Sequence, residues 1–357
     1  MRIREATLDD NSDLTEFVAH SPMSAGTHFV LDRAPDFFRL LQLRGDSRTF
    51  IAEAKHHGIA GIVTALWHDV RDRERNVRLG EIVDLRVAPW ARGGGTTARL
   101  LHAAKDALIE AVVSWVVFLI GDRNTDAVRL VSGGAGLPSL ESLTRFASIH
   151  YVAWRPPRRK NQGHGARAAR PDERDILDDL RDEMNVTRRF VPHALLDPTD
   201  PSTDQTSWII PGSNGTAAGA LIVWDGHAVR RVRIVRYRRE DTLLRIGVSL
   251  ASRLGLANRL PNEGDVLRIW ASRFIGLREP NRGAIRSLVD LSLRAATDAG
   301  AHVVQLNLPE SDPLLRLLPR YPRSIYWSTL YGRPFIGNDR PFKRRGSDVF
   351  HADVALV

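Results

Sequence analysis

The sequence predicts an α/β protein, of the α+β kind, built from two tandem units. The chain has 357 residues, which at roughly 150 residues per domain suggests two domains. Segments with strand patterns alternate with segments with helix patterns. The order starts again after a stretch rich in Pro, Arg and Gly, because Ala166–Asp172 resembles Ile3–Asp9. We therefore expect domains at 1–154 and 166–357, joined by a linker at 155–165.

The first unit shows the clearer element signals. A strand at 2–7 precedes a helix at 9–19 that an aspartate can cap, and a second helix is expected at 36–43. A hairpin turn at 55–58 joins strands at 49–54 and 59–67, and a polar run at 71–76 reads as a loop. Pro89 ends the strand at 81–87, because proline cannot donate to a ladder. Helices at 97–112 and 124–131, a buried strand at 115–120 and a closing strand at 146–154 complete the unit.

The second unit repeats this order less clearly. We expect helices at 172–184 and 284–299, with an additional helical segment at 245–260. The expected strands are 208–210, 217–224, 229–237, 265–275, 302–308 and 324–331.

Composition and charge exclude several classes of protein. There is no cysteine, which excludes disulfides, thiolate metal sites and a cysteine nucleophile. The longest apolar run, Ala111–Gly121, is shorter than the roughly 20 residues of a membrane-spanning helix. The N-terminus is charged from Arg2, so we expect no signal peptide, a cytoplasmic location and no membrane partner.

The net charge of +9 raises the question of nucleic-acid binding. The excess is spread over both units, and neither a reading helix nor an aromatic platform for RNA is visible. We therefore expect no nucleic-acid partner, although a diffuse positive field would attract a polyanionic ligand. We expect a monomer or a homodimer.

One stretch carries the chemistry. The strand Glu81–Val87 is followed by Pro89, by the turn Arg92-Gly93-Gly94-Gly95-Thr96-Thr97 and by an amphipathic helix. Glycines let a backbone approach a ligand closely, and the free N–H groups at a helix start form an anion site suited to a pyrophosphate. A Walker loop needs a lysine that is absent here, and a dinucleotide fingerprint lacks its third glycine and its ribose-binding acid.

This stretch resembles the acetyl-CoA signature of the GCN5-related N-acetyltransferase superfamily, which is Arg/Gln-x-x-Gly-x-Gly/Ala after a Leu-x-Val-x-Pro strand. Leu85, Val87, Pro89, Arg92 and Gly95 are in register, while Thr97 replaces the usual final Gly or Ala. The resemblance implies that each unit is a mixed, mostly antiparallel sheet flanked by helices, with acetyl-CoA as the donor substrate.

The resemblance also implies roles for individual residues. Leu85 and Val87, with Arg86 between them, would hold the pantetheine arm and the thioester, and the amides of Arg92 to Thr97 would hold the pyrophosphate. Asn124 and Ala127 match the Asn-x-x-Ala helix start that contacts the CoA arm in the family.

The catalytic groups are less clearly marked. A neutral amine is needed for direct transfer, so a base or a chain of waters must take its proton. Glu81 and Asp84 are the candidate bases, and their spacing of three places them on opposite faces of a regular strand. The tyrosine that often serves as general acid in the family is Val131 here, which leaves Ser132, Tyr151 or water.

Other constellations are weaker. His56, His57 and His68 have no matching carboxylate spacing, so we expect no metal. No Gly-x-Ser-x-Gly elbow is present. In the second unit, Pro280 takes the place of the signature arginine and the bulky Ile285 takes the final small position, so we expect a degenerate copy without CoA binding.

The sequence thus predicts an N-acetyltransferase that transfers acetyl from acetyl-CoA directly to a primary amine of a small molecule. Two alternatives remain open, a protein or peptide N-acetyltransferase and a non-catalytic acyl-CoA-binding module. A longer acyl donor or a carrier-protein pantetheine is a further variant, which residues near Ile82 and Leu119 would decide.

Overall fold

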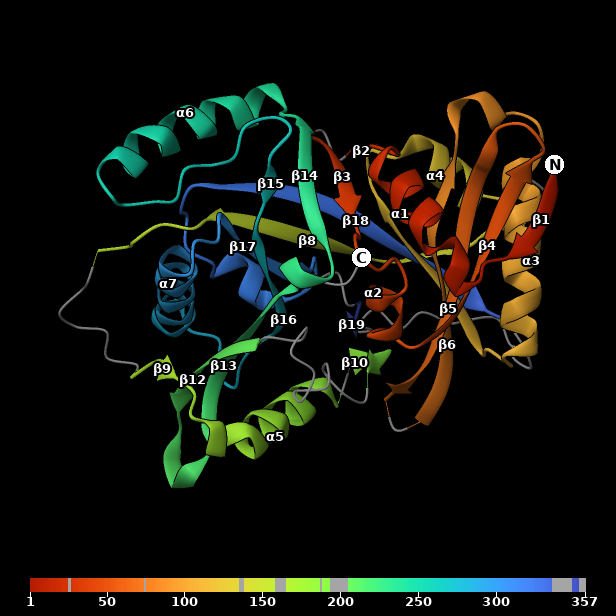
Figure 1. The fold of residues 1–357 in the computed structure, drawn as a ribbon. Helices are drawn as coiled ribbons and strands as arrows, with labels where there is room; N and C mark the ends of the chain where they lie inside the picture. Colours follow the sequence, from red (N-terminus) through yellow and green to blue (C-terminus); the bar gives the residue numbers. More distant parts are fainter. Residues whose placement is uncertain are drawn as a thin grey trace.

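The computed structural model describes residues 1–24, 27–73, 75–134, 138–157, 165–186, 188–192, 205–335 and 349–352. Thirteen strands within these residues form one mixed sheet that extends through both halves of the chain (Figure 1). Every neighbouring pair is antiparallel except β6–β7 and β16–β17, which are parallel. In spatial order the strands are β1 (Arg2–Glu5), β4 (Asp46–Ala54), β5 (Gly58–Asp72), β6 (Arg75–Val87), β7 (Trp115–Gly121), β18 (Arg323–Pro334), β8 (Glu141–Val152), β17 (Val303–Pro309), β16 (Ile269–Leu277), β13 (Ala217–Asp225), β12 (Gln205–Pro211) and β9 (Arg167–Ala168), and β11 (Val191–Pro192) pairs with β5.

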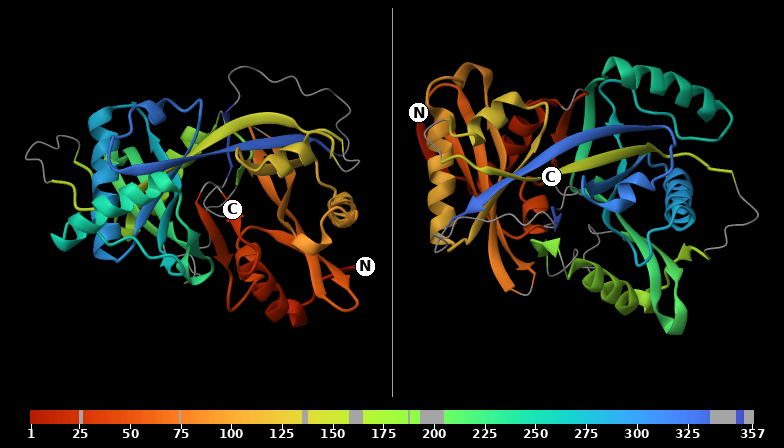
Figure 2. Two further views of the ribbon diagram at one scale, coloured as in Figure 1. Left: turned by 90° about the horizontal axis from the view of Figure 1, so that it is seen from above. Right: turned by 180° about the vertical axis from the view of Figure 1, so that it is seen from behind.

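The two halves exchange their closing strands at the centre of this sheet. β7 pairs with β18 from the second half instead of with β8. In the same way β17 pairs with β8 from the first half. β8 and β18 also pair with each other over most of their length, and they run side by side through the centre of the molecule (Figure 2).

Helices cover both faces of the first half. α3 (Thr96–Glu110) buries Leu100, Ala104 and Leu108 against one face. α1 (Asn11–Ala19) and α2 (Arg39–Gln42) bury Leu14 and Leu41 against the other. Successive strand residues point to opposite faces, so each strand serves both cores. A further short helix, α4 (Thr125–Val131), follows β7.

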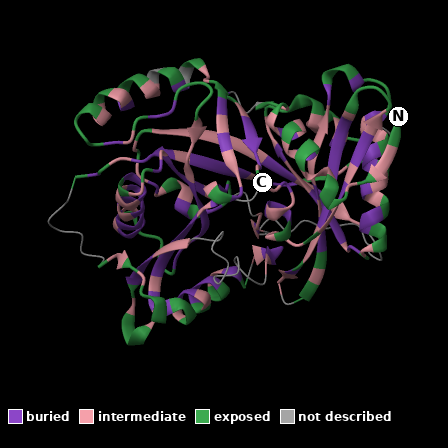
Figure 3. Cartoon of the chain, viewed as in Figure 1, coloured by how far each residue is buried: buried purple, intermediate pink, exposed green. Residues whose placement is uncertain are grey.

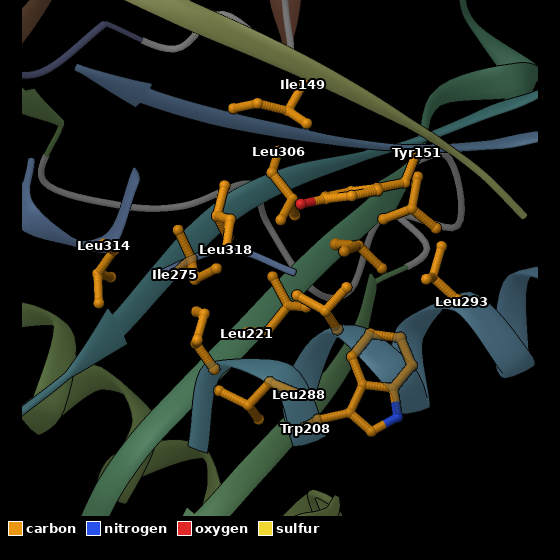
Figure 4. Close-up of a cluster of buried hydrophobic side chains, with 14 of the residues drawn as sticks. Ile149, Tyr151, Trp208, Leu221, Ile275, Leu288, Leu293, Leu306, Leu314 and Leu318 are labelled. Atoms are coloured by element: carbon orange, nitrogen blue, oxygen red, sulfur yellow. The ribbon is translucent and has the colours of Figure 1, made fainter. Parts of the chain in front are cut away.

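The second half is built in the same way. α7 (Arg282–Asp298) packs Leu288 and Leu293 against Leu221, Ile275 and Leu306 of the sheet, in the largest core of the molecule (Figure 4). α5 (Arg174–Asn185) covers the opposite face. Buried residues accordingly run along the sheet in both halves, while the outer sides of the helices are exposed (Figure 3).

Two small sheets complete the structure. β2 (Met23–Ser24), β3 (His28–Asp32), β14 (Arg231–Arg236) and β15 (Val266–Leu267) form the first, in which β3 of one half pairs with β14 of the other. β10 (Arg188–Arg189) and β19 (Val349–Phe350) form the second. α6 (Arg239–Arg253) follows β14. No helix within the described ranges is long and apolar enough to cross a bilayer.

The predicted class, a mixed and mostly antiparallel sheet flanked by helices, is confirmed, but the strands join into one sheet. The polar run predicted as a loop at 71–76 is largely strand, because β5 extends to Asp72 and β6 begins at Arg75. The segment 229–237 forms β14 of the small sheet, and the second helix is only one turn long. The additional helix begins six residues earlier than predicted. The domain boundaries remain a prediction, and residues 158–164 of the linker lie outside the described residues.

Candidate functional site

The site begins where the parallel strands β6 and β7 separate. Their ladder consists of three residue pairs and ends at Glu81 and Val117. Beyond it β6 contains a bulge, because Ile62 of β5 pairs with Arg86 but Thr64 pairs with Val83. The extra residue bends β6. We call the unpaired ends, residues 82–87 of β6 and 118–121 of β7, the fork.

The fork exposes peptide groups that a sheet would normally pair. Ala88 N donates to Ala60 O at 2.8 Å, and alternate residues of an antiparallel strand bond to the same neighbour. The peptide groups of Arg86 therefore face β5, while those of Leu85 and Val87 face the fork. On the other side Asp122 N donates to Trp327 O of β18, so the same alternation turns the peptide groups of Leu119 into the fork.

The Gly-rich turn lies at the end of β6 and leads into α3. Gly93 and Gly95 have φ values of 81° and 75°, a region that favours glycine. A Cβ atom at any of the three glycines would meet nothing within 4 Å. Within the described residues, the amides of Thr96, Thr97 and Ala98 have no hydrogen-bond acceptor. The start of α3 is thus an open set of donors at the positive end of a helix dipole.

The remaining predicted donor-site residues have different local roles. Arg92 is exposed, and its Nε donates to Val87 O at 3.4 Å. Thr96 is buried and its hydroxyl donates to Ala91 O, whereas Thr97 is half-buried. Asn124 caps α4, where its side chain accepts from Ala127 N at 3.1 Å. Contact of these residues with a ligand remains a prediction.

Arg86 is oriented differently from Leu85 and Val87. Its peptide groups pair with β5, and its guanidinium donates to Val18 O and Ser21 O at the end of α1. It therefore lies on the α1 side of the sheet and has a structural role there, while its assignment to the CoA arm stays a prediction.

The two candidate bases lie on the same face instead of on opposite faces, because the bulge changes the alternation after Val83. Glu81 is 2.7 Å from Arg44 and 3.7 Å from His68, and 19% of its side chain is exposed. Asp84 has a φ of 53° and a 5% exposed side chain, at 2.7 Å from Arg33 and 3.7 Å from Arg86.

These partners have an electrostatic consequence. Burial lowers the pKa of the Arg33 guanidinium, and the neighbouring Asp84 partly offsets this. Burial lowers the pKa of Arg86 in the same way. Asp84 thus compensates two buried cations and fixes the bulge, whereas Glu81 keeps some exposure beside the fork. The segment 33–44, which supplies Arg33 and Arg44, has no sequence signal that could have indicated this role.

The alternative proton donors are not at the fork. Val131 is buried at the end of α4, and the Ser132 hydroxyl donates to Val128 O within that helix. Tyr151 is buried in the core of the second half, where it donates to Pro319 O, and burial raises its pKa. Tyr151 is therefore a packing residue of that core.

The histidines are dispersed. His57 lies in the β4–β5 turn beside His56, and its ring stacks on Trp90 with centroids 5.1 Å apart. His68 lies on β5 beside Glu81. Among the described residues, no three His, Asp or Glu side chains are grouped so that they could hold a metal ion.

The second half contains a corresponding fork that is closed. The β16–β17 ladder ends at Ala271 and Gln305, and Arg273 forms the bulge. Asn307 N then donates to the Ser272 hydroxyl at 3.0 Å. At the start of α7 the Asn281 side chain accepts from Gly283 N and Ala284 N at 2.7 and 3.2 Å.

The bulky Ile285 does not obstruct this helix start, because its side chain is fully buried in the core. The Asn281 cap occupies the amides instead.

Comparisons with known proteins support the fold. No protein-family model matches the chain, and no curated protein does. Among solved structures, the N-myristoyltransferase of Saccharomyces cerevisiae with bound myristoyl-CoA covers 92% of this chain, with 82% of its own chain aligned, a TM-score of 0.59 and 11% identity. A conserved protein of unknown function from Enterococcus faecalis, described as a probable N-acyltransferase, covers 94% with 72% of its own chain, a TM-score of 0.52 and 12% identity.

A third structure, a GCN5-related N-acetyltransferase from Anabaena variabilis, covers 94% of this chain and 73% of its own, with a TM-score of 0.51 and 13% identity. These likenesses extend over both halves of the chain. The chain therefore has the fold of the GCN5-related N-acetyltransferase and N-myristoyltransferase structures, as the strand–turn–helix resemblance predicted.

Proposed function

We propose that this protein is an acyl-CoA-dependent N-acetyltransferase that transfers acetyl from acetyl-CoA directly to a primary amine of a small molecule. The observation that carries the proposal is the fork between β6 and β7, which opens beside an uncapped helix start. The resemblance of the turn to the acetyl-CoA signature and the shared fold both support it.

The donor would be held almost entirely by backbone groups. The peptide groups of Leu85, Val87 and Leu119 face the fork, where they can bond the amides of a pantetheine arm as a further strand would. The amides of Thr96, Thr97 and Ala98 point to the turn, where they can receive a pyrophosphate. With the donor bound in this way, its thioester would lie at the narrow end of the fork, near Glu81.

Transfer then requires a neutral amine. The amine nitrogen attacks the thioester carbonyl, the new C–N bond forms, the C–S bond breaks, and the proton lost by the amine goes to a base. Glu81 is the better candidate, since Asp84 is engaged by two buried guanidinium groups. The departing CoA thiolate takes its proton from water.

A short acyl group fits the residues at the fork. Ile82 is buried against α3 and Leu119 is half-buried, and both are bulky and apolar. Ile82 and Leu119 correspond in position to Ser272 and Asn307 of the second half. There, Asn307 N donates to the Ser272 hydroxyl. This favours acetyl over a long chain such as the myristoyl group carried by one of the structural neighbours.

Donor binding is tested by the melting temperature with and without acetyl-CoA. We expect a rise for the wild type and none for Gly95→Trp, because the indole would fill the turn. Gly300→Trp is the matched control, since Gly300 has a φ of 74° and is also free of neighbours within 4 Å. No rise in the wild type with any acyl-CoA would sink the proposal.

Turnover is tested by the release of free thiol from acetyl-CoA with pools of small amines and with pools of peptides. Release with small amines supports the proposal. Release only with peptides would indicate a protein or peptide N-acetyltransferase, and binding without turnover on any pool would indicate a non-catalytic acyl-CoA-binding module.

A further inference from the structure

A second surface of the molecule combines exposed apolar side chains with exposed arginines. It lies on α6 and the residues that flank it, at the opposite end of the molecule from α3 (Figures 1 and 2). Between residues 229 and 260 the chain carries nine arginines and two acidic residues. This segment is therefore strongly basic, within a chain whose net charge is +9.

The outer side of α6 is apolar at its middle. Ile246 is 57% exposed and Leu250 is 59% exposed, and Leu254 directly after the helix is 75% exposed. The opposite side of the helix is anchored by Val248 and by the buried Asp241. Exposed residues recur along α6, with half-buried residues between them (Figure 3). Three large aliphatic side chains in one row is more than scattered surface residues explain.

Arginines lie at both ends of this row. Arg239 and Arg253 are seven residues before and after Ile246, which at 100° per residue places all three on one side of the helix. Arg236 and Arg259 are exposed nearby. None of these four arginines forms an ion pair with another described residue. We call the four arginines together with Ile246, Leu250 and Leu254 the α6 patch.

We propose that the α6 patch docks the protein onto an anionic lipid surface. An interfacial helix inserts aliphatic side chains at the boundary of the acyl chains, while its arginines bind lipid phosphates. The positive charge selects an anionic occupant, and it disfavours a second copy of this chain, because two such patches would repel each other. An acidic carrier protein docked here would be far from the fork. The proposal departs from the sequence-based expectation of no membrane partner.

Co-sedimentation of the full chain with vesicles tests this proposal. We expect binding to vesicles of phosphatidylcholine with phosphatidylglycerol, much weaker binding to phosphatidylcholine alone, and loss of binding at high salt because salt screens the attraction. Leu250→Glu should weaken the partitioning by about ten-fold or more, because a leucine that becomes buried in the bilayer contributes more than about 1.4 kcal/mol. Arg253→Gln should weaken it by roughly five-fold.

Two control variants make the same substitutions outside the α6 patch. Leu8→Glu changes a 74% exposed leucine in the first half, and Arg129→Gln changes an exposed arginine on α4. Neither should affect partitioning, and all four variants should melt like the wild type. The proposal is wrong if anionic vesicles do not bind, if Leu8→Glu loses as much as Leu250→Glu, or if neutral vesicles bind equally well. It is also wrong if size-exclusion chromatography shows a dimer that Leu250→Glu dissociates, which would identify a second copy as the occupant.

Discussion

The first and second halves carry the same fork, and they complete it in opposite ways. In both, two parallel strands pair over three residues and separate at a bulge. In the first half bulky Ile82 and Leu119 follow the separation, and the helix start behind it keeps its amides free. In the second half Ser272 bridges the strands and a side chain caps the helix. The comparison shows that one backbone arrangement is left open or is closed, depending on a few side chains.

The largest effect on activity is expected at Glu81, which ends the β6–β7 ladder. The residue that ends the corresponding ladder of the second half is Ala271, which has no acidic group. Glu81→Gln removes the proposed base and should lower kcat by roughly 10² to 10⁴-fold, with little change in the acetyl-CoA-induced rise in melting temperature. Steady-state kinetics and the thermal shift together check this. An unchanged kcat would indicate that water, and not Glu81, takes the proton from the amine.

The bulges give the next prediction, because they carry Asp84 in one half and Arg273 in the other. Asp84→Asn leaves the buried Arg33 without its counterion and should lower the free energy of unfolding by about 3 kcal/mol. Asparagine tolerates a positive φ, so backbone strain contributes little to the change. Urea denaturation measures this, and a stability equal to that of the wild type would show that the ion pair is not essential to the bulge.

Ile82 holds the position in the first fork that Ser272 holds in the second, where the serine hydroxyl bridges the two strands. Ile82→Ser should weaken acetyl-CoA binding by roughly five-fold relative to Ile82→Ala, because the hydroxyl can bond the facing backbone as Ser272 does. Ile82→Ala is the matched control, since it loses the same burial without gaining a hydroxyl, and it should accept longer acyl groups. Titration calorimetry distinguishes the two, and equal affinities would contradict the closing role of serine.

The smallest effect concerns the cap of α7. Asn281→Ala should lower the free energy of unfolding by about 1 kcal/mol, the usual cost of losing an N-cap. Asn124→Ala removes the cap of α4 and provides a comparison of similar size. The variant should still bind only one acetyl-CoA per chain, because Ser272 continues to bridge the second fork. A second bound equivalent would mean that the cap alone closes this site.

The local parts of this site could be predicted from the sequence, and the long-range parts could not. The strand, the turn and the helix from Glu81 to Leu101 follow one another along the chain, so their pattern is complete in a single stretch. The bulge leaves no such mark, and it overturned the prediction that Glu81 and Asp84 face opposite sides. Arg33 and Arg44 reach them from a segment without periodicity, across 51 and 37 residues of chain.

The exchange of β8 and β18 was also beyond prediction. Both are apolar strands that could close either half, and pattern alone does not choose between them. Packing across the whole sheet decides the pairing. The polar hairpin at 71–76 was misread for a related reason, because its strands extend beyond the hydrophobic core that makes a strand recognisable.

The exchanged strands have a consequence for how the protein is made. β7 meets its neighbour β18 only after most of the chain has been synthesised, and the hydrogen bond between Asp122 and Thr329 spans 207 residues. Until then the nascent first half has an open strand edge beside the fork, and such edges attract other chains. The first half therefore cannot complete its sheet before β18 has been synthesised, so expression of residues 1–154 alone should yield an aggregating fragment.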